Sequence, residues 1–101
     1  MMIRENRPDR MTPDLIALQA LAWIMSDTPR AERFLAMTGH SADSLRSAIA
    51  DPSNLAAVIN FLENYEPDLI ACAEHMGINP MDLVSARHIL DGSKNEEGYI
   101  C

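Results

Sequence analysis

The sequence predicts an all-α protein, a compact bundle of about five to six short helices. Apolar residues recur at the i, i+3, i+4 spacing of a helix, and nowhere do apolar and polar residues alternate over the length of a strand. Prolines divide the chain into short segments that each have one apolar face. The 101 residues are 48% hydrophobic but only 5% aromatic, with seven Met, so we expect an aliphatic core. A chain of this length forms one domain.

The most apolar segment covers residues 15–25, with the sequence LIALQALAWIM. At 1.5 Å per residue it is about 16 Å long, roughly half of what a bilayer crossing needs. A helix that is apolar on nearly every face requires neighbours on all sides. We therefore expect a helix over residues 13–26 to be the central helix of the bundle, with Trp23 in the core.

Proline marks the starts of the predicted helices. It suits the first turn because the N–H that it lacks would be unpaired there, and a preceding Thr, Asp or Asn cap is worth about 1 kcal/mol. Four such pairs occur: Thr12-Pro13, Thr28-Pro29, Asp51-Pro52 and Asn79-Pro80; a fifth proline follows Glu66, which is the weakest of these caps. With Ser41 as a further start, and Gly39, Gly77 and Gly92 as ends, they predict helices over residues 13–26, 29–38, 41–50, 52–65, 67–76 and 80–90.

Each of the later segments has one face that we expect to point inward. These faces consist of Ala31, Phe34, Leu35 and Thr38; Leu45, Ala48 and Ile49; Leu55, Val58, Ile59 and Leu62; Leu69, Cys72, Ala73 and Met76; and Leu83, Ala86 and Leu90. A shift of 38 residues aligns Pro29 with Pro67 and Gly39 with Gly77. This weak repeat hints at two similar three-helix halves.

Both ends of the chain lack helical periodicity. We expect a flexible arm at residues 1–11, a single all-helical domain at 12–92 and a flexible tail at 93–101. The formal net charge is −7: the arm carries +1 and the remainder −8. Such a surface repels phosphate and argues against binding to nucleic acid or to a membrane. The N-terminus lacks the apolar stretch of a signal peptide, and two Cys make no disulfide framework, so we expect a cytoplasmic protein.

Five segments between residues 17 and 92 have a distinctive pattern: ALQALAWI, RFLAMTG, LRSAIADP, AAVINFL and ARHIL. In these segments the chain resembles a small bacterial family, of alphaproteobacterial type, called the domain of unknown function 3572 family. The resemblance covers nearly the whole predicted domain and implies an all-helical cytoplasmic protein. It implies no activity, substrate or site, so the function has to be argued from the residues.

Cys72 and His75 are the first candidates for chemistry, because residues three apart can share one side of a helix. With His88 or Cys101 they would form a zinc ligand set, and with Glu74 a nucleophilic site. However, the chain has no CxxC motif and no His pair at ligand spacing, and no Gly-rich turn supplies an oxyanion hole. We interpret Cys72 as a core residue and His75 as a surface residue. The sequence predicts no catalytic residue, no metal and no cofactor.

Three carboxylates, Glu63, Glu66 and Asp68, cluster at the junction of two predicted helices. A divalent ion could use such oxygens. Three carboxylates across a turn are nevertheless more typical of a solvated corner whose charges interact with a helix dipole. We adopt the second interpretation.

Residues 67–76 and 80–90 have the outline of a helix-turn-helix, with Gly77 in the turn. In a DNA complex the second helix would lie in the major groove, with Ser85, Arg87 and His88 as contacts. Asp82 in its first turn, its single Arg and the acidic charge of the domain argue against this function. Nucleic-acid binding is therefore the alternative interpretation.

By subtraction, the sequence favours a non-catalytic protein-interaction module whose partner is another protein. The expected contact surface is the outer side of the last helix, with Met81, Val84, Arg87 and His88, or else the basic arm. An exposed apolar patch would support this hypothesis, and a uniformly polar surface would count against it. The oligomeric state stays open at this stage.

Overall fold

The computed structural model describes the backbone of residues 12–99 and the side chains of residues 12–92. Within this range the chain forms six α-helices and no strand, which confirms the predicted all-α class. The helices are α1 (Pro13–Met25), α2 (Thr28–Thr38), α3 (Ala42–Ala48), α4 (Pro52–Glu63), α5 (Glu66–Met76) and α6 (Pro80–Tyr99). The predicted arm at residues 1–11 lies outside the described residues. None of the described helices combines the length and the hydropathy that a membrane span needs.

The predicted helix starts are right to within a residue or two. Thr12 and Asp51 cap α1 and α4 as expected, and Ser41 begins α3 with a capping box. At two of the five prolines that mark predicted starts, the boundary lies one residue earlier. Asp27, not Thr28, accepts a hydrogen bond from the first turn of α2, at 3.0 Å, and α5 begins after Tyr65 without a side-chain cap. Proline tolerates either position in the first turn, because neither requires its missing N–H.

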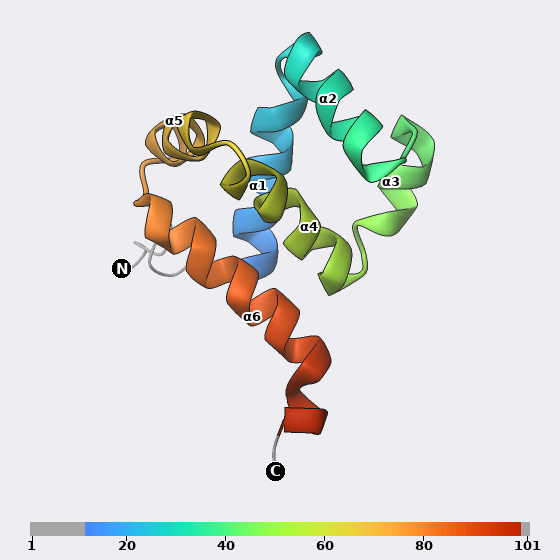
Figure 1. Cartoon of the computed structure of the whole chain (residues 1–101), viewed down its shortest axis with the longest axis vertical. Helices are drawn as coiled ribbons and strands as arrows, with labels where there is room; N and C mark the ends of the chain where they lie inside the picture. The colour runs from blue at the N-terminus through green and yellow to red at the C-terminus, as the bar shows by residue number, and fades with distance from the viewer. Residues whose placement is uncertain (1–11, 100–101) are drawn as a thin grey trace, which may run out of the picture.

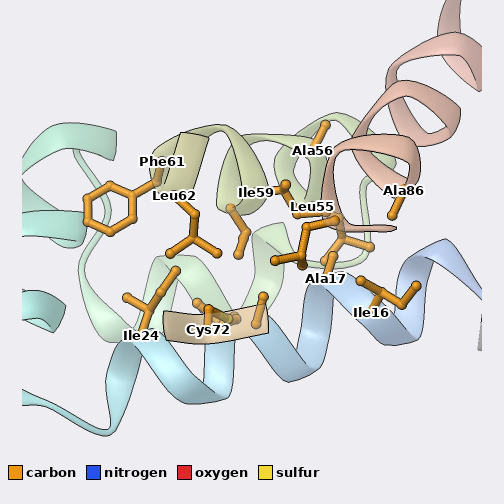
Figure 2. Close-up of a cluster of buried hydrophobic side chains, with 14 of the residues drawn as sticks. Ile16, Ala17, Ile24, Leu55, Ala56, Ile59, Phe61, Leu62, Cys72 and Ala86 are labelled. Carbon is orange, nitrogen blue, oxygen red and sulfur yellow. The ribbon is translucent and has the colours of Figure 1, made fainter. Parts of the chain in front are cut away.

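The centre of the bundle is α4, which packs against α1, α5 and α6 (Figure 1). The side chains of α1 and α4 point toward one another across the core (Figure 2). Buried side chains from all six helices join one cluster: Ile16, Ala17, Ala20, Leu21, Ile24, Phe34, Leu45, Leu55, Ala56, Val58, Ile59, Phe61, Leu62, Cys72, Ala73, Leu83, Ala86 and Leu90. The inward faces predicted for the 52–65 and 80–90 segments are confirmed in full.

The prediction that the 13–26 helix is surrounded on all sides is wrong. On α1, Leu15 is 42% exposed and Leu18 is 37% exposed, while Ile16, Ala17 and Ile24 are buried. The other helices pack against one side of α1, so its outer stripe faces solvent although it is apolar. Trp23, expected in the core, is only partly buried.

The 38-residue repeat recurs in the helix boundaries but not in the packing. The bounds of α2 and α5 differ by this shift, and both helices end at a glycine in the left-handed conformation, Gly39 with φ 78° and Gly77 with φ 75°. The starts of α3 and α6 show the same shift. However, α6 packs against α1, α4 and α5, whereas α3 buries only Leu45. The two halves therefore share the positions of their helix boundaries, but the corresponding helices pack differently.

The predicted end of the last helix, at residues 90–92, is also wrong, because α6 continues to Tyr99 and extends beyond the other helices (Figure 1). Gly92 stays within the helix and is absent from the left-handed glycines among the described residues. A mid-helix glycine costs only about 1 kcal/mol relative to Ala, and the Lys and Glu residues that follow are good helix formers.

Two glycine substitutions should therefore change stability in opposite directions. Gly77→Ala should lower the free energy of unfolding by about 1 kcal/mol, because an L-residue is strained at this positive φ. Gly92→Ala should raise it by about 0.5–1 kcal/mol, because alanine favours the helix. A new Cβ would meet nothing within 4 Å at either position, so backbone conformation alone decides the sign. Urea unfolding measures both. A destabilising Gly92→Ala would place a helix end at that glycine instead.

Candidate functional site

The outer side of α6, which the sequence nominates as a contact surface, is largely open to solvent. Met81 is 65% exposed, His88 is exposed and Val84 is half-buried. Their i, i+3, i+7 spacing places them on one face of the helix. Arg87 does not belong to this open face. Its guanidinium turns to α4 instead.

The Arg87 side chain is only 21% exposed and binds two carboxylates. Its Nε donates a hydrogen bond to Glu63 of α4, and its Nη1 donates one to Asp91 at 2.9 Å. The hydrogen bond to Glu63 is the main reason that the pKa of Arg87 lies above its ordinary value. Arg87 thus ties α6 to α4. Ser85, Arg87 and His88 are the residues predicted to contact DNA. Of these, only Ser85 and His88 are exposed.

Two of the three clustered carboxylates form ion pairs with arginines. Glu63 binds Arg87, and Asp68 accepts a hydrogen bond from Arg33 at 2.8 Å. Glu66 lies in the first turn of α5, where its charge meets the positive end of the helix dipole. Among the described residues no group of three His, Cys, Asp or Glu side chains is arranged to hold a metal ion.

Cys72 is a core residue, as the sequence analysis proposes. Its side chain is fully buried between α1 and α4 (Figure 2), and its Sγ lies 3.8 Å from the Met76 Sδ. Burial raises the pKa of the Cys72 thiol to about 11, although the positive charge of Arg30 opposes the shift. The thiolate, not the thiol, is the nucleophile, so this residue is both inaccessible and protonated near neutral pH. His75 is exposed.

Every arginine among residues 12–92 has a carboxylate within ion-pair distance. The pairs are Arg30 with Asp27, Arg33 with Asp68, Arg46 with Asp43, and Arg87 with Glu63 and Asp91. The same range contains eleven Asp and Glu residues against these four arginines. Carboxylates therefore outnumber cations on the described part of the chain, and each arginine lies near at least one of them.

A groove that the sequence analysis did not predict lies between α2, α3 and α4, with a volume of about 280 Å³. Phe34, Leu45 and Phe61 contribute its apolar part, and the two rings meet edge to face at 5.2 Å with an interplanar angle of 83°. Met37, which is 61% exposed, lies at its opening. The lining comprises Phe34, Met37, Thr38, His40, Leu45, Asn54, Ala57, Asn60, Phe61 and Asn64.

The polar part of the groove is dominated by three asparagines. Asn54 donates from Nδ2 to the Ala48 carbonyl at 2.9 Å, which ties α4 to the end of α3. Asn60 and Asn64 are exposed, and within the described part of the chain their carboxamides have no hydrogen-bond partner. Thr38 donates to the Phe34 carbonyl at 2.9 Å. The described lining contains no Asp, Glu, Lys or Arg, so the groove is uncharged apart from any charge on His40.

A second hollow, between α1 and α5, is lined by Gln19, Ala22, Trp23, Ser26, His75 and Met76. Arg30 covers the Trp23 ring, with its Cζ 3.6 Å from the ring centroid, and donates to the Trp23 carbonyl at 2.7 Å. The Arg30 Nε is buried without a hydrogen-bond partner in the described structure. The Trp23 ring therefore already makes a cation–π contact with Arg30 of the same domain, and this ring face is not open to a ligand.

The sequence gives no specific signal for the groove. Residues 52–63, PSNLAAVINFLE, contain a single charged residue, Glu63, although 23% of the chain is charged. This low charge fits a helix that packs against α1, α5 and α6, with six of its residues buried.

Comparison with known proteins identifies a family for this chain. No curated protein and no solved structure matches the chain significantly. The model of the family described as "Protein of unknown function (DUF3572)" matches residues 10–93, which include helices α1 to α5 and most of α6. This match confirms the resemblance seen in the sequence. The chain therefore belongs to the DUF3572 family.

Proposed function

We propose that this domain is a non-catalytic protein-interaction module that binds a partner protein in the groove between α2, α3 and α4. One observation supports the proposal: the groove is an uncharged hollow between three helices, with the exposed Met37 at its opening and the exposed carboxamides of Asn60 and Asn64 along its side. A concave apolar site with a few convergent polar groups is the usual form of a binding site.

The energetics favour an apolar side chain of the partner in this groove. Fully burying one such side chain stabilises a complex by about 1.5–3 kcal/mol. Met37 extends this apolar surface at the opening, and methionine adapts readily to different partners. The exposed face of α6, with Met81 and His88, is the alternative contact surface, and the experiment below separates it from the groove.

The absence of catalysis is part of the proposal, and two observations support it. The buried Cys72 thiol, whose pKa is about 11, is a poor nucleophile. Two of the three clustered carboxylates are held by Arg33 and Arg87, which leaves them poorly placed for acid–base chemistry.

The preference for a protein over a nucleic acid rests on charge. All four arginines of the described side chains face carboxylates, and phosphate binding requires free cations. Nucleic-acid binding by α5 and α6 is kept as an outcome of the experiment.

Affinity capture from extract of the source cell, with and without nuclease, tests the proposal. Three versions of the full chain serve as baits: the wild type, Asn60→Trp, which fills the groove, and Met81→Glu, which places a charge on α6. Both positions are exposed, so circular dichroism and the thermal midpoint should match the wild type. We expect a protein partner that survives nuclease treatment, that Met81→Glu retains and that Asn60→Trp loses at least tenfold.

Two other results would count against the proposal. Loss of the partner with Met81→Glu but not with Asn60→Trp would move the interface to α6 and overturn the assignment of the groove. Loss of every captured protein after nuclease treatment would support the helix-turn-helix alternative.

A further inference from the structure

The solvent-facing side of α6 complements a second copy of itself. We infer that the protein forms a weak dimer in which two α6 helices pack antiparallel, with Ser85 at the two-fold axis. Met81 of each copy then lies against Ile89 of the other, and Asp82 of each pairs with His88 of the other. This surface is separate from the groove between α2, α3 and α4, so the inference does not depend on the proposed function.

Two strongly exposed apolar side chains lie on this side of α6. Met81 is 65% exposed and Ile89 is 57% exposed, and Ser85, midway between them, is exposed as well. Residues four apart form one row along a helix, so these three make a single ridge. The ridge lies on the side of the helix away from the buried Leu83 and Leu90. The small side chain in its middle lets a second helix approach closely.

Two polar side chains beside this ridge complement each other but cannot meet within one copy. Asp82 and His88 are both exposed. They lie six residues apart on the same helix, where only residues three or four apart come into contact. Among the described residues His88 has no ion-pair partner, and the Asp82 carboxylate accepts a hydrogen bond from the Asn79 backbone N–H alone, at 3.0 Å. Each copy therefore offers one acceptor and one donor that a second copy can pair.

An antiparallel arrangement satisfies the apolar and the polar groups together. With the two-fold axis at Ser85, Met81 lies level with Ile89 of the second copy, because the two positions are equally far from the axis. Asp82 lies level with His88 of the second copy for the same reason. The imidazole has an N–H donor in either protonation state, so it can pair with the carboxylate. A parallel arrangement would instead set two aspartates level with each other, and like charges across an interface oppose association.

The length of α6 supports the same arrangement. The helix continues to Tyr99 and extends beyond the other helices of its own bundle (Figure 1). A short helical end without a neighbour is marginal in water. In the antiparallel pair, position 93 of one copy lies level with position 77 of the other, so the end of α6 runs beside the turn between α5 and α6 of the second copy. The second copy thus covers the part of the helix that extends past its own bundle.

The dimer is weak, because its contact is small and both copies are acidic. Interfaces that bury less than about 1,200 Å² are typical of weak complexes, and one pair of short helices belongs to this class. Two chains of net charge −7 also repel each other. We expect a Kd on the order of 10–100 μM. At the lower concentrations of an affinity capture the chain is a monomer, so the groove is tested separately.

Sedimentation equilibrium of the full chain, over a hundredfold range of concentration around this Kd, measures the association. A reducing agent keeps Cys101 from forming a disulfide. Ile89→Glu should raise the Kd at least tenfold, because it places a carboxylate on the apolar ridge. Ala36→Glu adds a negative charge at an exposed position of α2 and should leave the Kd within twofold of the wild type. Both positions are exposed, so circular dichroism should show a folded domain in each variant.

Variants of His88 test the polar pair. His88→Glu should raise the Kd at least tenfold, because it sets a carboxylate of one copy against Asp82 of the other. His88→Arg keeps an N–H donor and carries a permanent positive charge, so it should lower the Kd about threefold. Opposite effects of the two substitutions at one exposed position indicate a charge partner across the interface.

Cysteine cross-linking tests the register. In a Cys101→Ser background, Ser85→Cys should form a disulfide-linked dimer on mild oxidation, because Cα atoms at the two-fold contact come within the 4.4–6.8 Å or so that a disulfide requires. Met81→Cys by itself should not, because positions 81 of the two copies are about 12 Å apart along the helix axis. A mixture of Met81→Cys with Ile89→Cys should link the two variants, which mass spectrometry identifies.

Three results would overturn the inference. A monomer at every concentration would refute the dimer. A dimer whose Kd does not change with Ile89→Glu would place the interface on another face. A dimer that links Met81→Cys chains to each other, or that His88→Glu leaves unchanged, would refute the antiparallel register. Because Asn60 lies outside this interface, the capture experiment with Asn60→Trp bears on the groove alone.

Discussion

Ile59→Ala should lower the free energy of unfolding by about 3 kcal/mol. Ile59 is fully buried on α4, and truncation of such a residue removes its transfer free energy and leaves a cavity, at a typical cost of about 2–5 kcal/mol. Domains of this size have total stabilities of about 5–15 kcal/mol. The variant should therefore lose a large share of its stability, and its thermal midpoint should fall by about 12–24 °C.

The matched control is Leu15→Ala on α1, which lies in the segment that the sequence marks as most apolar. Because Leu15 is 42% exposed, this change should cost less than about 1 kcal/mol. Chemical unfolding of both variants at one pH gives the comparison. Equal costs at the two positions would mean that the outer stripe of α1 is covered in solution, as the sequence by itself suggests.

Raising the pH from 8.5 to 10.5 should destabilise the wild type by about 1.7 kcal/mol more than it destabilises Cys72→Ala. Burial raises the pKa of the folded-state thiol from 9.0 to about 11. Below pH 9 the thiol is protonated in both states, and its contribution to stability is intact. Between pH 9 and 11 the unfolded chain releases this proton while the folded chain keeps it, so unfolding becomes easier at about 1.4 kcal/mol per pH unit.

Urea unfolding across this range measures the difference, and Cys72→Ala removes the titrating group while keeping a small apolar side chain. Thiol labelling gives an independent test. In a Cys101→Ser background, Ellman's reagent should modify Cys72 only as fast as the domain opens, because the side chain has no exposed surface. Rapid labelling at pH 8 under native conditions would show that the thiol is accessible.

The local features of the fold followed from the sequence because short-range chemistry controls them. The proline and cap pairs set the starts of α1 and α4, and Gly39 and Gly77 set the ends of α2 and α5. The helical spacing in residues 55–62 and 83–90 identified their buried faces. Each of these features depends on contacts between residues no more than about four positions apart, so the local sequence is enough to predict it.

The groove could not be predicted in the same way. Its floor combines Phe34 of α2, Leu45 of α3 and Phe61 of α4, and its polar side comes from neutral asparagines that no search for ligands or charges selects. The two phenylalanines look like ordinary core residues in the sequence, and both are in fact buried. Only the angle between α2, α3 and α4 leaves a hollow above them.

Arg87 illustrates the same limit. In the sequence it is the one arginine of a helix with a helix-turn-helix outline, and its partner Glu63 lies in another helix. The long-range pairing that turns it inward arises only when α6 packs against α4.

The sequence by itself determined the helices of this protein, their starts, most of their ends and the inward faces of α4 and α6, because backbone capping and apolar periodicity act over one or two turns. The tertiary structure decided which helix lies at the centre, that Leu15 and Leu18 face solvent, that Arg87 is tied to α4, and where a groove opens. These features depend on the angles at which helices pack, which the summed shapes of many distant side chains determine and no short stretch of sequence encodes.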